Sequence, residues 1–146
     1  MTARIVILLS LVCIVLTGCV AYPVTMQQTE SSGLNSPYSG TNVRLENGVL
    51  SVQLADPTIK DADFRRIKLV EAILITDAGK EIALKLWATN HGNGVTFLFK
   101  PKDSGFSGDR FELRITTSLD GKATTITGRF NVHDVGKWVS WRDLNG

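Results

Sequence analysis

The sequence contains few side chains of the kinds that perform chemistry. His91 lies in a Gly/Asn loop, and His133 follows an apolar strand and precedes Asp134. Imidazole and carboxylate groups could bind a metal together if these strand ends met. The two histidines are about forty residues apart and no third patterned ligand accompanies them, which is not the spacing of a metal site. We therefore predict exposed histidines, with no bound metal and no other cofactor.

Nucleophilic and acid–base catalysis have no better support. The segment Gly105-Phe106-Ser107-Gly108 is not a Gly-x-Ser-x-Gly elbow, and it lacks the strand-to-helix context that strains such a serine. Two pairs of carboxylates lie in loops, Asp61 with Asp63 and Asp103 with Asp109. Aspartate is common in loops because it favours turn geometry. The sequence thus predicts a protein that is not an enzyme.

The most specific motif surrounds Cys19. A basic start, residues 1–4, precedes an apolar run, residues 5–16, that is too short to span a bilayer as a helix. The run ends in Leu16-Thr17-Gly18-Cys19, which resembles the lipobox of bacterial lipoproteins. The resemblance implies that residues 1–18 are a signal peptide and that Cys19 becomes the acylated N-terminus. An ordinary signal peptide, cut at a small residue near Cys19, is the alternative.

A lipidated Cys19 would anchor the chain to a membrane, since two or more acyl chains give stable attachment. Val20 follows the cysteine, and no aspartate stands there. The sorting rule that comes with the resemblance then favours the outer membrane, with the domain facing the periplasm. Cys13 would leave with the signal peptide, so no second thiol would remain for a disulfide.

The charges are balanced and interspersed. The chain has 16 basic and 14 acidic residues and a net charge of +2. Such a surface does not favour polyanions, so we expect no nucleic-acid partner.

Composition divides the rest of the chain into two parts. Residues 19–42 are rich in Gln, Ser, Thr, Asn, Gly and Pro, and they predict a lipidated N-terminus followed by a flexible tether. Residues 43–146 predict a single β domain, because alternation with a period of two begins there.

Alternating apolar residues indicate a series of short strands separated by turns. They lie at residues 50–54, 67–75, 82–86, 95–99, 111–115, 126–132 and 137–141, with turns at 77–79, 90–94 and 120–121. About seven such strands, spaced by eight to twelve residues, predict an all-β fold, an antiparallel immunoglobulin-like β-sandwich. A short helical turn is expected within residues 56–63, where Asp56 precedes Pro57 and could cap it.

The last predicted hairpin carries a second resemblance. Gly108-Asp109-Arg110-Phe111, Ser118-Leu119-Asp120-Gly121 and Gly128-Arg129-Phe130 resemble the corresponding hairpin of periplasmic copper-binding proteins of the CopC type. That family holds its metal with a histidine in this turn and another near the mature N-terminus. Here Lys122 occupies the turn position and no histidine lies near Cys19, so the resemblance brings no copper ligands with it.

Aromatic residues supply the candidate contact surfaces. Phe106 lies between two glycines, where it could be an exposed ligand-contact tip or a plug at the end of the sandwich. Trp138 and Trp141 would face opposite sides of a terminal strand, so that one of them could meet a partner. Trp87 is out of phase with Leu84 and Leu86, which indicates a surface aromatic or a strand covered on both faces.

These observations favour a non-catalytic function. We expect an outer-membrane-anchored lipoprotein that binds or assembles another envelope protein, with Phe106, Trp138 and Trp141 as candidate contacts. The alternative is a periplasmic carrier of a metal or small ligand, of the CopC kind. Such a carrier would need convergent His, Met or carboxylate ligands, and Met26 is the only methionine after the signal peptide.

Overall fold

A computed structural model describes the backbone of residues 21–140 and the side chains of residues 23–136. The chain divides into two compact units, of which Gln27–His133 is one. The other comprises Met1–Met26 and Asp134–Gly146; where it is described, its backbone is extended.

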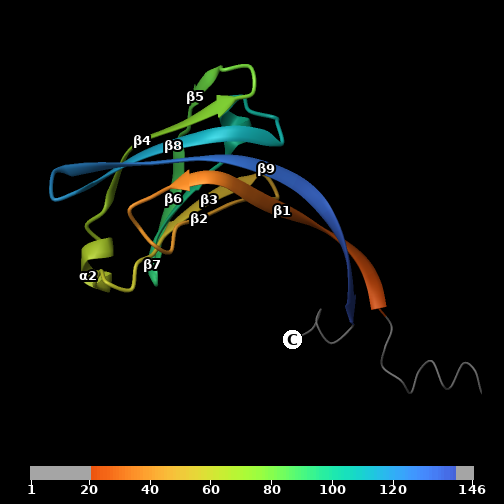
Figure 1. Ribbon diagram of the computed structural model, residues 1–146, viewed down its shortest axis with the longest axis horizontal. Helices are drawn as coiled ribbons and strands as arrows, with labels where there is room; N and C mark the ends of the chain where they lie inside the picture. Colours follow the sequence, from red (N-terminus) through yellow and green to blue (C-terminus); the bar gives the residue numbers. More distant parts are fainter. Residues whose placement is uncertain (1–20, 141–146) are drawn as a thin grey trace, which may run out of the picture. The chain divides into compact units, whose positions relative to one another are not determined.

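The described residues form nine strands in two antiparallel sheets (Figure 1). The five-stranded sheet has the order β1-β9-β8-β4-β5, and the four-stranded sheet has the order β2-β3-β7-β6. The strands are β1 (Ala21–Asn35), β2 (Asn42–Glu46), β3 (Val49–Leu54), β4 (Lys68–Thr76), β5 (Glu81–Ala83), β6 (Leu86–Gly92), β7 (Gly94–Phe99), β8 (Arg110–Leu119) and β9 (Lys122–Ser140). A short helix, α2 (Asp61–Phe64), precedes β4, and a 3-10 turn, η1 (Pro101–Ser104), precedes β8.

The core between the sheets follows from the alternation of the strands. Every second residue of β3 and of β8 is buried, because successive side chains of a strand point to opposite faces. The largest side chains without exposed surface come from both sheets: Phe97, Phe99, Leu50, Leu54, Leu74 and Ile115. The prediction of an antiparallel two-sheet sandwich is therefore confirmed.

Strand β1 corrects one prediction. A flexible tether was expected over residues 19–42, yet Ala21–Asn35 is a strand paired with β9. Leu34 packs against the core, and the side chains of Thr29 and Gln27 accept hydrogen bonds from β2 and from the turn after it. The expectation was wrong for this segment because a polar strand can be held by backbone pairing and side-chain caps with little apolar burial of its own.

A second unpredicted strand, β2, forms a hairpin with β3. The pairs Asn42↔Gln53 and Glu46↔Val49 enclose the turn Asn47-Gly48, whose φ values are 51° and 77°. Asn-Gly with two positive φ angles is the hairpin turn that matches strand twist best. The number of strands is therefore nine rather than about seven.

Two predicted strands have different limits. Residues 82–86 were expected to be one strand, but β5 ends at Ala83 in one sheet and β6 begins at Leu86 in the other. Between them the buried Leu84 donates its N–H to the carbonyl oxygen of Ala72 at 2.8 Å. Conversely, the last two predicted strands are one long strand, β9.

Two of the predicted turns are present in the structure. Asp120 and Gly121 join β8 to β9 with φ values of 52° and 81°, as a tight two-residue hairpin. The expected helical turn is also present as α2, although Lys60 and not Asp56 stands at its N-cap. Asp56 instead accepts hydrogen bonds in the loop before it.

Candidate functional site

Three of the predicted functional residues cannot be placed. Cys19 and Trp141 lie outside the described residues. Trp138 lies in β9, and its side chain is likewise outside the described part. Lipidation at Cys19 and contact through either tryptophan stay predictions.

Phe106 is not an exposed tip. Its side chain is 5% exposed and meets Phe111 edge to face, with ring centroids 5.7 Å apart. Phe111 in turn stacks on Phe130 at 5.4 Å. The interpretation of Phe106 as an exposed tip therefore does not hold, and its ring is part of the core, as the alternative interpretation expected. The cause is packing: a buried aromatic triplet stabilises the end of the core more than an exposed ring would.

The two histidines are not brought together. His91 lies in β6 of the four-stranded sheet, and His133 lies in β9 of the five-stranded sheet. His133 Nε2 is 3.6 Å from Glu30 Oε1, a pair that is charged on both sides only when the imidazole is protonated. Within the described residues, no three His, Cys, Asp or Glu side chains gather closely enough to hold a metal ion.

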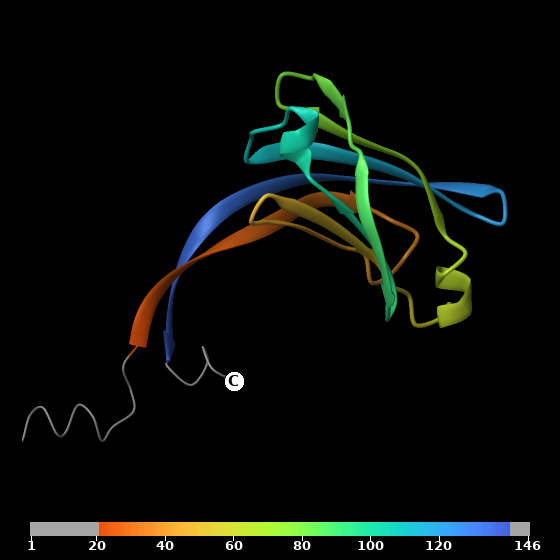
Figure 2. The ribbon, with the colours of Figure 1, turned by 180° about the vertical axis from the view of Figure 1, so that it is seen from behind.

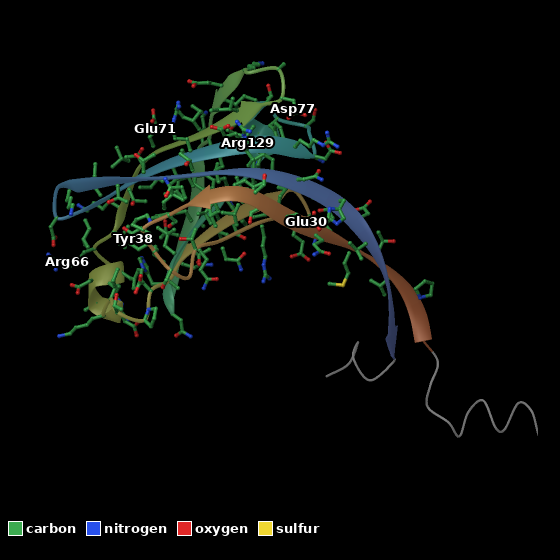
Figure 3. The ribbon with its side chains drawn as sticks, viewed as in Figure 1. Glu30, Tyr38, Arg66, Glu71, Asp77 and Arg129 are labelled. Carbon is green, nitrogen blue, oxygen red and sulfur yellow. The ribbon has the colours of Figure 1, made fainter. Side chains whose placement is uncertain are left out.

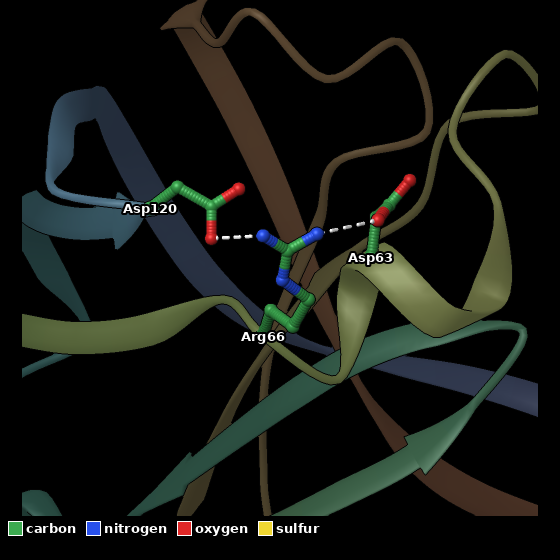
Figure 4. A network of polar contacts seen from close by, with 3 residues as sticks. All are labelled: Asp63, Arg66 and Asp120. Atoms are coloured by element: carbon green, nitrogen blue, oxygen red, sulfur yellow. Dashed lines mark hydrogen bonds and ion pairs between the residues drawn. The ribbon is translucent and has the colours of Figure 1, made fainter.

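Arg66 forms the most connected polar contact (Figure 4). Its guanidinium group contacts Asp63 at 3.1 Å and also Asp120, so it ties α2 to the β8–β9 turn. Hydrogen bonding and charge attraction from Asp120, and then from Asp63, raise the pKa of Arg66. All three side chains are substantially exposed, so the contact fixes the position of a loop and does not form an enclosed site.

Asp56 holds a second loop junction. It accepts hydrogen bonds from the Thr58 hydroxyl at 2.6 Å, the Thr58 N–H at 2.9 Å and the Ser39 N–H at 3.2 Å. These donors, the Thr58 hydroxyl first, lower the pKa of Asp56 to about 2. The three donors hold the ionised carboxylate in place, so Asp56 stabilises the junction of these two loops.

The outer face of the five-stranded sheet bears a depression of about 600 Å³. Figure 3 labels Glu30, Asp77 and Arg129, which line it from β1, the β4–β5 turn and β9. Arg129 is 79% exposed and already pairs with Glu112 at 3.2 Å. A small ligand would remain in water here and would compete with that ion pair. The depression is therefore open polar surface and not a formed binding pocket.

The outer edge of the four-stranded sheet is the strongest candidate. Strand β6 is the last strand of that sheet and pairs only with β7 (Figure 2). Its register shifts between Leu86 and Ala88, so Trp87 is the extra residue of a β-bulge. The prediction of Trp87 as a surface aromatic is confirmed, since its side chain is 54% exposed and that of Leu86 is 44% exposed.

A cation completes this surface. Lys100 Nζ lies 4.0 Å from the centroid of the Trp87 ring, within the range of a cation–π contact. Lys85, just before β6, is exposed. We call the edge strand β6 with Lys85 and Lys100 the β6 edge. An exposed tryptophan beside lysines, on a strand whose outer side has no strand partner, is suited to binding another polypeptide.

Comparison with protein-family models, with curated proteins and with solved structures gives no significant match. Within residues 21–140, no helix is both long enough and apolar enough to cross a bilayer.

Proposed function

We propose that the protein is a lipid-anchored lipoprotein of the bacterial outer membrane whose sandwich, of immunoglobulin-like type, binds another envelope protein without catalysing a reaction. The observation that carries the binding role is the β6 edge, where a tryptophan 54% exposed to solvent lies on an edge strand whose outer side has no strand partner. The lipobox Leu16-Thr17-Gly18-Cys19 supports the anchor. Trp138 and Trp141 remain candidates for additional contacts.

A binding role fits the chemistry of the described surface better than a carrier role. The contacts around His133, Arg66 and Asp56 are each satisfied by neighbours within the protein. A carrier of a metal or small ligand would need several donors directed at one empty point. The β6 edge, by contrast, leaves backbone groups and an aromatic ring available to a partner.

The experiment is crosslinking in living cells of the tagged protein, followed by mass spectrometry of the adducts. We expect one dominant envelope protein among the adducts and a much weaker yield from Cys19→Ala, because the anchor confines the domain to the partner's membrane. Metabolic labelling with palmitate reports lipidation of the same two chains independently. The absence of an enriched partner under several growth conditions would contradict the binding role.

A further inference from the structure

We propose that the β6 edge is a strand-addition site, at which an extended and acidic segment of a partner protein pairs with β6. The inference deepens the proposed function and rests on it. An unpaired edge strand presents a row of N–H and C=O groups to any chain that can pair with it, so the protection of each edge decides where a partner strand can add.

The outer edge of β2 and the edge strand β5 are each protected against an added strand. The N–H of Leu45 in β2 donates to Thr29 Oγ1 at 2.9 Å, and the N–H of Asn47, in the turn after β2, donates to Gln27 Oε1 at 3.0 Å. Side chains of β1 thus cover the outer edge of β2, which brings the edges of the two sheets together at that side. Strand β5 is only three residues long and begins with Glu81, which pairs with Arg114 at 2.9 Å. Short length and charge are the usual protections of an edge.

Part of β4 beyond β5 is also unpaired on one side, and it too is protected. This part, Lys68–Glu71, carries a charge of each sign and a bulge at Val70. Both charged side chains are exposed. A strand approaching here would have to bury an unpaired lysine or glutamate, which is costly.

Strand β6 has neither kind of protection over its regular part. It has seven residues, and none of them is an aspartate, glutamate, lysine, arginine or proline. No described side chain donates to or accepts from its backbone. The bulge at Trp87 interrupts the pairing only at the first residues of β6. From Ala88 to Gly92 the register with β7 is regular. The outward N–H and C=O groups of this part can therefore pair with an added strand.

Charge identifies the kind of partner. Two lysines stand at this edge, the exposed Lys85 just before β6 and Lys100 just after β7. Lys100 lies over Trp87 at the start of β6, where an added strand would contact the side chain of Trp87 as well as the backbone. An acidic side chain on the incoming strand would neutralise these lysines, while its apolar neighbour would cover Trp87 and Leu86.

The same observations argue against two other occupants. If two copies paired antiparallel through β6, about Thr89 as the centre, Lys85 of each would lie opposite Asn93 of the other, so no lysine would gain a carboxylate. A bilayer would cover Leu86 and Trp87 but would leave the unpaired backbone groups without partners. A foreign acidic strand satisfies both the backbone and the lysines.

The test uses the purified full chain and a phage-displayed library of random 12-residue peptides. Enriched peptides are synthesised, their Kd values are measured by fluorescence polarisation, and amide exchange maps the binding site. We expect extended peptides that contain acidic residues, with slowed exchange in residues 86–92. Trp87→Ala should weaken binding at least about tenfold. Lys100→Glu should weaken acidic peptides severalfold, and added salt should weaken them as well.

Val70→Ala provides the matched control, because Val70 is also an exposed apolar residue at a bulge. Its peptide affinity should equal that of the unmodified chain. The proposal is overturned if no peptide is enriched, if enriched peptides bind equally well to Trp87→Ala and Lys100→Glu, or if exchange slows elsewhere. Self-association that Trp87→Ala abolishes would replace it with a dimer, and binding to anionic vesicles that depends on Trp87 would replace it with a membrane contact. None of these results depends on the lipid anchor, so the two proposals can fail separately. A partner crosslinked in cells to another face of the domain would uphold the proposed function and contradict the strand-addition site.

Discussion

Replacing Thr117 with valine tests whether a polar group inside the sandwich reduces its stability. Thr117 lies on the inner face of β8, has no exposed surface, and pairs with Leu69 of β4 and Thr124 of β9. Its Oγ1 atom forms no hydrogen bond with any described residue. A hydroxyl group buried without a partner loses its hydrogen bonds to water on folding and receives nothing in return.

The expected magnitude follows from two contributions. An unsatisfied buried hydroxyl costs about 1–3 kcal/mol. Valine has almost the same shape as threonine and replaces the hydroxyl with a methyl group, whose burial contributes about 0.8 kcal/mol. Because neighbours relax and the denatured state changes as well, we expect the free energy of unfolding to rise by about 1–2 kcal/mol. For a domain of this size, that corresponds to about 4 °C in Tm for each kcal/mol.

Urea unfolding, followed by circular dichroism, measures the change. Thr116→Val is the matched control, since Thr116 is the preceding residue on the outer face of β8 and its Oγ1 lies 3.3 Å from Thr125 Oγ1. The control should change stability by less than about 0.5 kcal/mol. If Thr117→Val lowers the free energy of unfolding while Thr116→Val leaves it unchanged, the hydroxyl of Thr117 has a partner and the reasoning is refuted.

Three further predictions concern loops and turns. Phe106→Ala should lower the free energy of unfolding by about 3 kcal/mol, because it empties the contact with Phe111; a loss below 1 kcal/mol in urea unfolding would instead indicate an exposed tip. Gly94→Ala should cost about 3 kcal/mol or prevent folding, since Gly94 has φ of 115° and an added Cβ would lie 2.1 Å from the carbonyl oxygen of Leu54. Gly79→Ala is its control, with positive φ but open space, and an equal loss in both would show that close approach to Leu54 contributes nothing. Asp56 has a folded pKa of about 2, below its usual 3.8, so it stabilises the fold fully above pH 4 and less as pH falls towards 2. Asp56→Asn should therefore lower the urea midpoint at pH 6 more than at pH 2.5, and an equal effect at both pH values would contradict the assignment.

The core of the sandwich could be predicted because its signal is local. In β3 and β8 the apolar residues alternate, and each alternation is visible within six to ten residues. The Asp120-Gly121 turn is equally local, since two adjacent residue types specify two positive φ angles. The Asn47-Gly48 turn gives the same signal, and the alternating apolar residues Val43 and Leu45 lie just before it. Strand β2 could therefore have been predicted from the same rule.

The missing elements depend on contacts that are distant in sequence. Strand β1 is polar, and its position is stabilised by pairing with β9 and by hydrogen bonds of Thr29 and Gln27 to β2 and to the turn after it. No property of residues 21–35 alone shows these partners. The change of sheet after Ala83 is similarly hidden, because the alternation continues through Leu84 to Leu86 and no glycine or proline interrupts it. Phe106 left two interpretations open for the same reason, since only packing against Phe111 decides between them.

Two bulges show why the candidate site needed the topology as well as the pattern. Val70 and Trp87 are both extra residues in their strands, and both are exposed apolar side chains. Val70 lies between Leu69 and Glu71 in a stretch that charged residues protect against pairing, so its exposure has no consequence for binding. Trp87 lies at the start of an edge strand of seven residues without aspartate, glutamate, lysine or arginine, next to a lysine from the loop after β7. The out-of-phase position of Trp87 can be seen in the sequence, whereas its place on an unprotected edge follows from the order β2-β3-β7-β6, which no local pattern specifies. An exposed aromatic residue becomes a binding-site hypothesis only when the backbone beside it also lacks a partner.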